Sequence, residues 1–338
     1  MNHRIVRTTL AALLACALAA PTLAVADEPA AGPIKLKLAT IAPPSTPWAT
    51  LITRIKKAFS KEIPAEQLAV KAYLGGALGG EKDLVSRCMS GGLGMIGVTS
   101  GALATVVPEL NVLELPYLWD DEKTVDKALA GELGDKLKAA MEKKGFVLYV
   151  WSENGFRHFA TRDRFIQALS DLKGLRMRAQ PSYVHTTMYK NFGATANPMP
   201  APEVPGALSS GVVDGYDNSL LYAFATQWYS NIKFLTVSSH IYQPAVIVFC
   251  KKVYDKLSPE MREKMMAQAA KIEAAGRALV RSGNRAALKS HEAAGVKVEK
   301  QKNRAVFLKA ARPGWDEFAS KTPDGKTLLD LAKKAAGR

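Results

Sequence analysis

The chain has 338 residues, 48% of them hydrophobic, and a formal net charge of +15, of which +11 lies in residues 251–338. This length excludes a single typical hydrophobic core and predicts two domains. The basic residues of the tail follow amphipathic helices without interleaved aromatics, which is typical of solvated faces and excludes a nucleic-acid partner.

Residues 1–26 have the features of a secretory signal peptide. Two arginines precede an apolar run over 8–20, and an Ala-Val-Ala cleavage pattern ends at Ala26. Apolar sequence continues past Cys16, which disfavours lipid attachment there. No later run reaches the roughly 18 apolar residues of a membrane span, so we expect a mature chain that is exported and soluble.

Cys88 and Cys250 are the cysteines that remain after the predicted cleavage. An oxidising compartment would permit a bridge between them, but one pair in so long a chain is no disulfide framework. We therefore expect two buried free thiols.

The first half of the mature chain alternates strands and helices. Period-two and short apolar runs predict strands over 34–39, 68–73 and 93–98, and 3.6-residue periodicity predicts helices over 48–59 and 81–91. Strand, helix and strand at this spacing are typical of a parallel crossover unit.

Gly92, Gly94 and Gly97 match the glycine fingerprint of dinucleotide-binding folds. They follow a predicted helix and lie within a predicted strand, whereas that fingerprint opens a helix whose N-terminus holds the phosphates. This context excludes a dinucleotide site.

The second half repeats the alternation. Asn154-Gly155 is a turn signal, and we place a crossing between the domains there. A helical pattern over 259–294 predicts a helix of about 54 Å, long enough to lie across both domains. The other predicted helices span 121–130, 133–143, 182–191, 219–228, 305–320 and 328–336, and the strands span 146–151, 156–160, 175–180, 212–217, 234–237 and 245–250.

The stretch 171–181 holds the first candidate site. Leu175, Met177 and Ala179 alternate with polar residues, so Arg176 and Arg178 are expected on one face of a short strand. The carboxyl end of a strand in an α/β sheet is where such folds place ligands, and the guanidinium fork matches a carboxylate.

Catalytic and metal-binding patterns are absent from the sequence. His291-Glu292 begins a zinc-protease motif, but Gly295 stands where its second histidine is required. Ser170 and Lys173 match a serine–lysine pattern that here precedes a strand and not a helix. We predict no catalytic residues, no metal and no cofactor.

Nine short motifs are spread along the mature chain. They are Lys37-Leu38-Ala39-Thr40, Pro47-Trp48, Leu78 to Leu84, Val107-Pro108-Glu109, Leu115 to Leu118, Asn154 to Arg157, Asp171 to Arg178, Gly211 to Gly215 with Asn218, and His240-Ile241-Tyr242. Together they resemble the DctP-type solute-binding proteins of tripartite ATP-independent periplasmic (TRAP) transporters. This resemblance implies an α/β fold, the two-lobed periplasmic binding protein fold with an interdomain cleft, crossing connections and a long helix spanning both lobes. It assigns residues 27–154 plus about 244–280 to lobe I and 155–243 plus about 281–338 to lobe II.

The resemblance also implies ligand-binding residues. Arg178 occupies the position of the arginine that forms the main salt bridge to the ligand carboxylate, and Arg157 and Asn218 occupy secondary positions. Glu81 matches a residue of the first lobe that faces the ligand across the cleft, whereas Arg176 is expected to stay solvated. Further candidates for ligand contact are Trp48, Phe156, Asp217 and Tyr242.

The family implies a periplasmic receptor, in a Gram-negative bacterium, that captures an organic acid by cleft closure and delivers it to membrane permease subunits. We expect a monomer, and the resemblance leaves room for an additional periplasmic component.

Two departures from the family pattern leave the substrate open. Ala201 stands where an aromatic residue is common, and Asp217-Asn218-Ser219 replaces the usual Glu-Asn-Pro, so a wider or differently floored pocket is expected. One alternative is a larger, mostly apolar ligand with a carboxylate head. Others are an exported enzyme with Glu81 or Asp217 as a base, and a basic scaffold that binds a membrane or polyanion through residues 251–338.

Overall fold

The computed structural model describes residues 32–338, so the predicted signal peptide and Cys16 lie outside the described residues. Nine strands of this region form one mixed sheet in the order β2-β1-β3-β8-β4-β7-β5-β6, with β9 paired to β8. The strands are β1 (Ile34–Thr40), β2 (Leu68–Tyr73), β3 (Met95–Thr99), β4 (Phe146–Thr161), β5 (Arg176–Ala179), β6 (Thr195–Pro198), β7 (Gly215–Ser219), β8 (Phe234–Cys250) and β9 (Lys297–Lys300).

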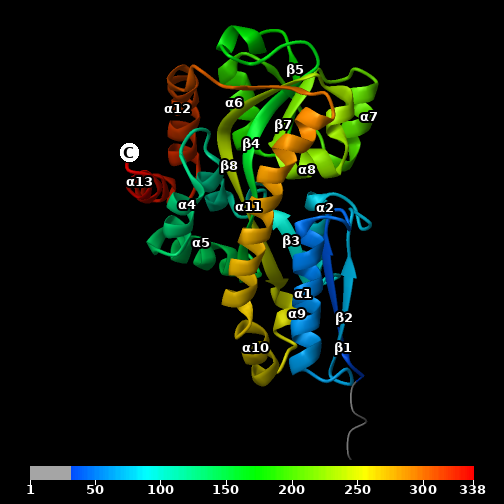
Figure 1. The fold of residues 1–338 in the computed structure, drawn as a ribbon. Coiled ribbons are helices and arrows are strands. Elements are labelled where there is room, and N and C mark those ends of the chain that lie inside the picture. Colours follow the sequence, from blue (N-terminus) through cyan, green and yellow to red (C-terminus); the bar gives the residue numbers. More distant parts are fainter. Residues whose placement is uncertain (1–31) are drawn as a thin grey trace, which may run out of the picture. The chain divides into compact units, whose positions relative to one another are not determined.

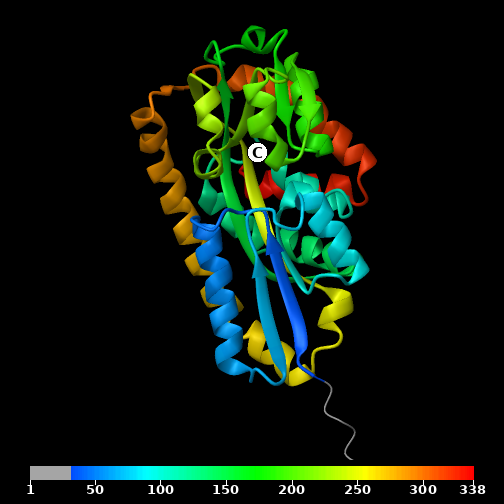
Figure 2. The same ribbon diagram turned by 90° about the vertical axis from the view of Figure 1, so that its right-hand side faces the viewer.

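Helices cover both faces of the sheet (Figures 1 and 2). In the region described, no helix combines the length and apolar character needed to cross a membrane. The helices are α1 (Pro47–Glu62), α2 (Glu81–Ser90), α3 (Ser100–Leu103), α4 (Glu122–Leu129), α5 (Glu132–Lys143), α6 (Tyr183–Phe192), α7 (Val204–Ser209), α8 (Leu220–Ala225), α9 (Lys251–Tyr254), α10 (Pro259–Met266), α11 (Ala269–Ala293), α12 (Arg304–Lys321) and α13 (Gly325–Ala335), with 3₁₀ turns at Pro108–Glu114, Leu169–Leu172, Ala201–Glu203 and Trp228–Asn231.

Two long antiparallel strands, β4 and β8, connect the two lobes of this α/β binding-protein fold (Figure 1). At one end β8 pairs with β3, which continues into the parallel strands β1 and β2. At the other end β4 pairs with β7, which continues into the parallel strands β5 and β6. Each half is therefore a small parallel sheet with its own buried helices, as the strand and helix alternation predicts.

The turn predicted at Asn154-Gly155 is wrong, because both residues lie within β4. Gly155 has φ +99°, and the pairing with β8 shifts register between Glu153 and Gly155, so the glycine forms a bulge within the strand. Sequence 234–250 is likewise one strand, β8, where two were predicted.

The helix predicted over 259–294 is interrupted at Ala267 and Gln268, so α11 has 25 residues. It still crosses both halves: it packs on α1 of the first lobe and on α8 of the second (Figure 1). Two of its glycines make this possible, because a Cβ at Gly276 would lie 2.9 Å from the side chain of Leu51, and one at Gly283 would lie 3.1 Å from Leu221.

Cys88 and Cys250 form a disulfide, so the prediction of two free thiols is wrong. α2 packs beside the end of β8 and brings the two Cα atoms to 5.1 Å, a spacing that a disulfide spans readily. The bond joins residues 162 positions apart and links α2 to the end of β8.

Replacing both Cys88 and Cys250 by serine is expected to lower the free energy of unfolding by about 2–4 kcal/mol, because the bond closes a long loop in the unfolded chain. Urea unfolding of the oxidised mature chain measures the change. A reductant should lower the stability of the wild type by a similar amount and leave the double variant unaffected. Two free thiols in the denatured, unreduced wild type would contradict the bond.

Candidate functional site

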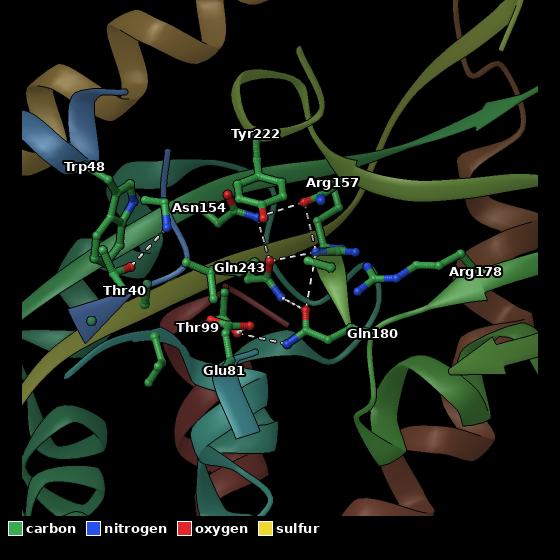
Figure 3. Close-up of a pocket in the computed structure, with 17 residues that line it drawn as sticks. Thr40, Trp48, Glu81, Thr99, Asn154, Arg157, Arg178, Gln180, Tyr222 and Gln243 are labelled. Carbon is green, nitrogen blue, oxygen red and sulfur yellow. Dashed lines mark hydrogen bonds between the residues drawn. The ribbon is translucent and has the colours of Figure 1, made fainter. Parts of the chain in front are cut away.

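A cavity lies where the carboxyl ends of strands from both lobes meet (Figure 3). Thr40 ends β1 and Thr99 ends β3, while Gln180 directly follows β5. The lining residues are Thr40, Ile41, Ala42, Trp48, Glu81, Gly97, Val98, Thr99, Asn154, Arg157, Arg178, Gln180, Ala201, Asn218, Tyr222, Gln243 and Ala245.

Arg178 is a buried cation in the wall of this cavity. Its side chain is only 3% exposed, yet it forms no ion pair with any carboxylate of residues 32–338. Its Nε and Nη2 donate to the carbonyl oxygen of Met199 at 3.2 and 2.9 Å, and the guanidinium lies 5.3 Å from the ring of Trp228. Burial, with Arg157 nearby, lowers the pKa of Arg178 to about 10. A buried cation without an anion is costly unless a ligand supplies one.

Arg157 lies beside Arg178 but is already paired. Its Nε donates to Asp217 Oδ2 at 2.5 Å, and its Nη2 donates to the Asp217 carbonyl at 2.5 Å. Its Nη1 donates to the side-chain oxygens of Gln243 at 2.7 Å and Asn218 at 3.2 Å. Burial alone would raise the pKa of Asp217, but Arg157 and His240 beside it hold that pKa well below its ordinary value.

Asn218 contributes an unused donor. Its Oδ1 accepts hydrogen bonds from Asn154 Nδ2 at 2.9 Å, from Arg157, and from the Ser219 backbone at 2.8 Å. Its Nδ2 donates to no residue of the described chain, and Asn218 lines the cavity. The bonds to the oxygen fix the orientation of the amide, so the nitrogen remains for a ligand.

The first lobe contributes Glu81 and Trp48 to the opposite wall (Figure 3). Glu81 Oε1 accepts from the Thr99 backbone at 2.6 Å, and Oε2 accepts from Thr99 Oγ1 at 3.0 Å. Burial raises the pKa of Glu81, although these hydrogen bonds oppose the shift. Trp48 donates its indole hydrogen to the Glu153 carbonyl at 3.0 Å, which fixes its ring in the wall of the cavity.

Behind the cavity a buried polar network joins the lobes. Glu114 accepts hydrogen bonds from Ser100, Gly101 and Gln243, and its Oε2 lies 2.6 Å from His185 Nε2. Gln243 also donates to Gln180, at 2.7 Å. Since these groups are buried and largely satisfied, the floor of the cavity is rigid and its orientation is fixed before a ligand enters.

Of the predicted contact residues, Arg178, Arg157, Asn218, Glu81 and Trp48 line the cavity. The other three, Phe156, Asp217 and Tyr242, lie outside the lining. Asp217 lies behind Arg157, whereas Tyr242 packs edge-on against Phe156 and donates its hydroxyl to Glu153 at 2.5 Å. Arg176, as expected, is solvated: its side chain is 48% exposed and pairs with Asp214 at 2.6 Å.

Sequence reasoning missed six polar lining residues. Gln180 is two positions after Arg178, so the alternation of that strand already placed both on one face. Asn154 was not predicted to line the site, because the Asn-Gly pair was interpreted as a turn. Tyr222 of α8 supplies an aromatic ring to a cavity in which Ala201 offers none. The missed residues are Thr40, Thr99, Asn154, Gln180, Tyr222 and Gln243.

A cavity between two lobes, walled by both of them and holding one unpaired cation, defines a bilobed binding protein for a small anion. Comparisons with known proteins identify the family. The family model described as bacterial extracellular solute-binding protein, family 7 (DctP), matches residues 38–322. This chain therefore belongs to the DctP family of solute-binding proteins of TRAP transporters.

Three known members of this kind of protein are similar to this chain in sequence or structure. The 2,3-diketo-L-gulonate-binding periplasmic protein YiaO of Escherichia coli is 30% identical over 264 residues, 78% of this chain and 80% of YiaO. The sugar acid binding protein DctPAm of Advenella mimigardefordensis, solved with galactonate, is 30% identical with a TM-score of 0.85 over 90% of this chain and 99% of that chain. A TRAP periplasmic solute-binding protein of a Bradyrhizobium species, solved with galacturonate, is 31% identical with a TM-score of 0.84 over 90% of this chain and 100% of that chain.

Proposed function

We propose that this protein captures a sugar acid in the periplasm and delivers it to the membrane permease subunits of a TRAP transporter. The observation that carries the proposal is the buried guanidinium of Arg178, which lies in the cavity wall without a carboxylate partner among residues 32–338. A ligand carboxylate would supply the missing charge through charge-assisted hydrogen bonds, each contributing about 1.5–3 kcal/mol.

The rest of the cavity suits the hydroxyl groups of such a ligand. Asn218 offers an unused amide donor, and Glu81 offers carboxylate oxygens from the opposite lobe. Similar proteins were solved with galactonate and galacturonate, both polyhydroxylated carboxylates. A larger, mostly apolar ligand is not favoured, because it would leave these polar groups without partners.

Closure is the proposed means of capture. We assign residues 27–154 plus about 244–280 to lobe I and 155–243 plus about 281–338 to lobe II, so that Arg178, Arg157 and Asn218 bind first and Glu81 and Trp48 close over the ligand. Contacts made by both lobes at once would then stabilise the closed form. In this proposal Phe156, Asp217 and Tyr242 support the contact residues from behind.

The remaining proposals concern assembly and chemistry. We propose that the receptor is monomeric, catalyses no reaction, and hands its ligand to the permease with or without an additional periplasmic component. Export would depend on the signal peptide predicted over residues 1–26.

A thermal-shift screen tests the function. Aldonates, uronates and short dicarboxylates are added to the mature chain, with the matching neutral sugars, such as galactose for galactonate, as controls. At 100 times its dissociation constant a true ligand adds roughly 2.7 kcal/mol of stability. We expect a shift with at least one sugar acid and none with its neutral sugar. Equal shifts with acid and neutral sugar, or a shift with no acid, would refute the proposal.

A further inference from the structure

The cavity has an unusual balance of charge. Three of the described residues that line it are charged: Arg157, Arg178 and Glu81. Because Arg157 is neutralised by Asp217, Arg178 and Glu81 are the charges left to act on a ligand. Among the described lining residues the cavity therefore has one available cation, and a second ligand carboxylate would find no cation of its own.

Two hydrogen bonds from Thr99 orient the carboxylate of Glu81. Both of its oxygens accept hydrogen bonds from Thr99, one from the backbone and one from the hydroxyl, and Gln180 of the other lobe donates to that hydroxyl at 2.9 Å. A carboxylate oxygen has two lone pairs, so each oxygen of Glu81 retains one for a donor from the ligand. Only a donor, such as a hydroxyl, suits that position.

We infer that Glu81 is a specificity-determining residue, which accepts a hydroxyl of the ligand and excludes sugar acids that carry a second ionised carboxylate. This inference rests on the proposed function and narrows it to hydroxylated monocarboxylates. The exclusion is electrostatic. Burial raises the pKa of Glu81, but the two hydrogen bonds from Thr99 favour its ionised form, and a second ligand carboxylate would face this charge in a desolvated cleft whose one available cation, Arg178, already binds the first carboxylate.

The probes are galactonate and galactarate, which share six carbons and the same pattern of inner hydroxyls but differ in the oxidation of the last carbon. Calorimetry on the wild-type mature chain at pH 7 should give an affinity at least 100-fold weaker for galactarate. In Glu81→Gln the gap should shrink to about 10-fold or less, because the amide carries no charge; its oxygen can still accept from the Thr99 backbone, while its nitrogen can donate to the Thr99 hydroxyl where the carboxylate accepts from it. Glu203→Gln, an exposed control two residues beyond the lining residue Ala201, should leave the gap unchanged.

The outcomes separate this inference from the function on which it rests. Similar affinities for the two acids in the wild type, or a gap that Glu81→Gln does not alter, would overturn the role of Glu81 while leaving the receptor function intact. A gap that shrinks equally in Glu203→Gln would also overturn it, since any nearby negative charge would then suffice. If no acid of the thermal-shift screen binds, the proposed sugar-acid function fails and this inference fails with it.

Discussion

Arg178→Ala is expected to weaken binding of the ligand carboxylate by about 2–5 kcal/mol, which is about 30-fold to several thousand-fold in dissociation constant. The size follows from burial. Arg178 is 3% exposed and is the cavity cation that no described carboxylate neutralises, so the variant leaves the ligand charge desolvated and unpaired. Calorimetric titration with the best acid from the thermal-shift screen measures the loss.

Arg176→Ala is the matched control for this prediction. Arg176 lies on the same strand two positions earlier, but it is 48% exposed and pairs with Asp214 outside the cavity. Its removal should change the affinity by less than about threefold, because exposed ion pairs contribute little. Loss of binding in both variants, or in neither, would contradict the assignment of Arg178 as the carboxylate anchor.

A second readout separates loss of contact from loss of fold. Since Arg178 is a buried cation without an anion in the unliganded protein, Arg178→Met should not lower the free energy of unfolding of the free protein and is expected to raise it. A variant that binds no acid and yet unfolds at the same or higher urea concentration would identify Arg178 as a residue kept for ligand binding. A clear decrease in the free energy of unfolding would show instead that Arg178 stabilises the fold of the free protein.

The periodic parts of the fold were predictable from the sequence. Alternation over 34–39 and 68–73 gave two paired strands, and the period of the 175–180 strand placed Arg178 and Gln180 on one face. The sequence reading failed where a local signal competes with tertiary pairing. Asn154-Gly155 is a strong turn pair in isolation, but pairing with β8 on one side turns it into a bulge within a long strand.

Other features depend on contacts between distant residues, which no local pattern encodes. The disulfide joins residues 162 positions apart, and nothing near Cys88 indicates that α2 will pack beside Cys250. The sequence motifs rank Arg178 ahead of Arg157 as a carboxylate contact, but they do not indicate the charges that surround either residue. Only the folded chain shows that one is neutralised by Asp217 and that the other remains available.

Arg157→Met is expected to lower the free energy of unfolding by about 3–5 kcal/mol, because it leaves Asp217 buried with no cation on its Oδ2. Asp217 is fully buried, and its remaining side-chain contacts include the Tyr189 hydroxyl, which donates at 2.7 Å, and His240 Nε2, which lies 3.4 Å from Oδ2. The double variant Arg157→Met/Asp217→Asn removes both charges, so it should recover at least half of the loss. Urea unfolding of the wild type, both single variants and the double variant measures the coupling between the two residues.

The same double variant tests whether Arg157 contacts the ligand carboxylate or only Arg178 does. If Arg157 mainly orients Asn218 and Gln243, the folded double variant should still bind the acid through Arg178, with an affinity reduced by about 10-fold or less. Adding Arg178→Met should then abolish the remaining binding. A stable double variant that binds no acid would mean that Arg157 also contacts the ligand carboxylate. In that case the bond to Asp217 would orient the Arg157 guanidinium toward the ligand. Arg157 would then be a second cation that the cavity offers to the ligand carboxylate.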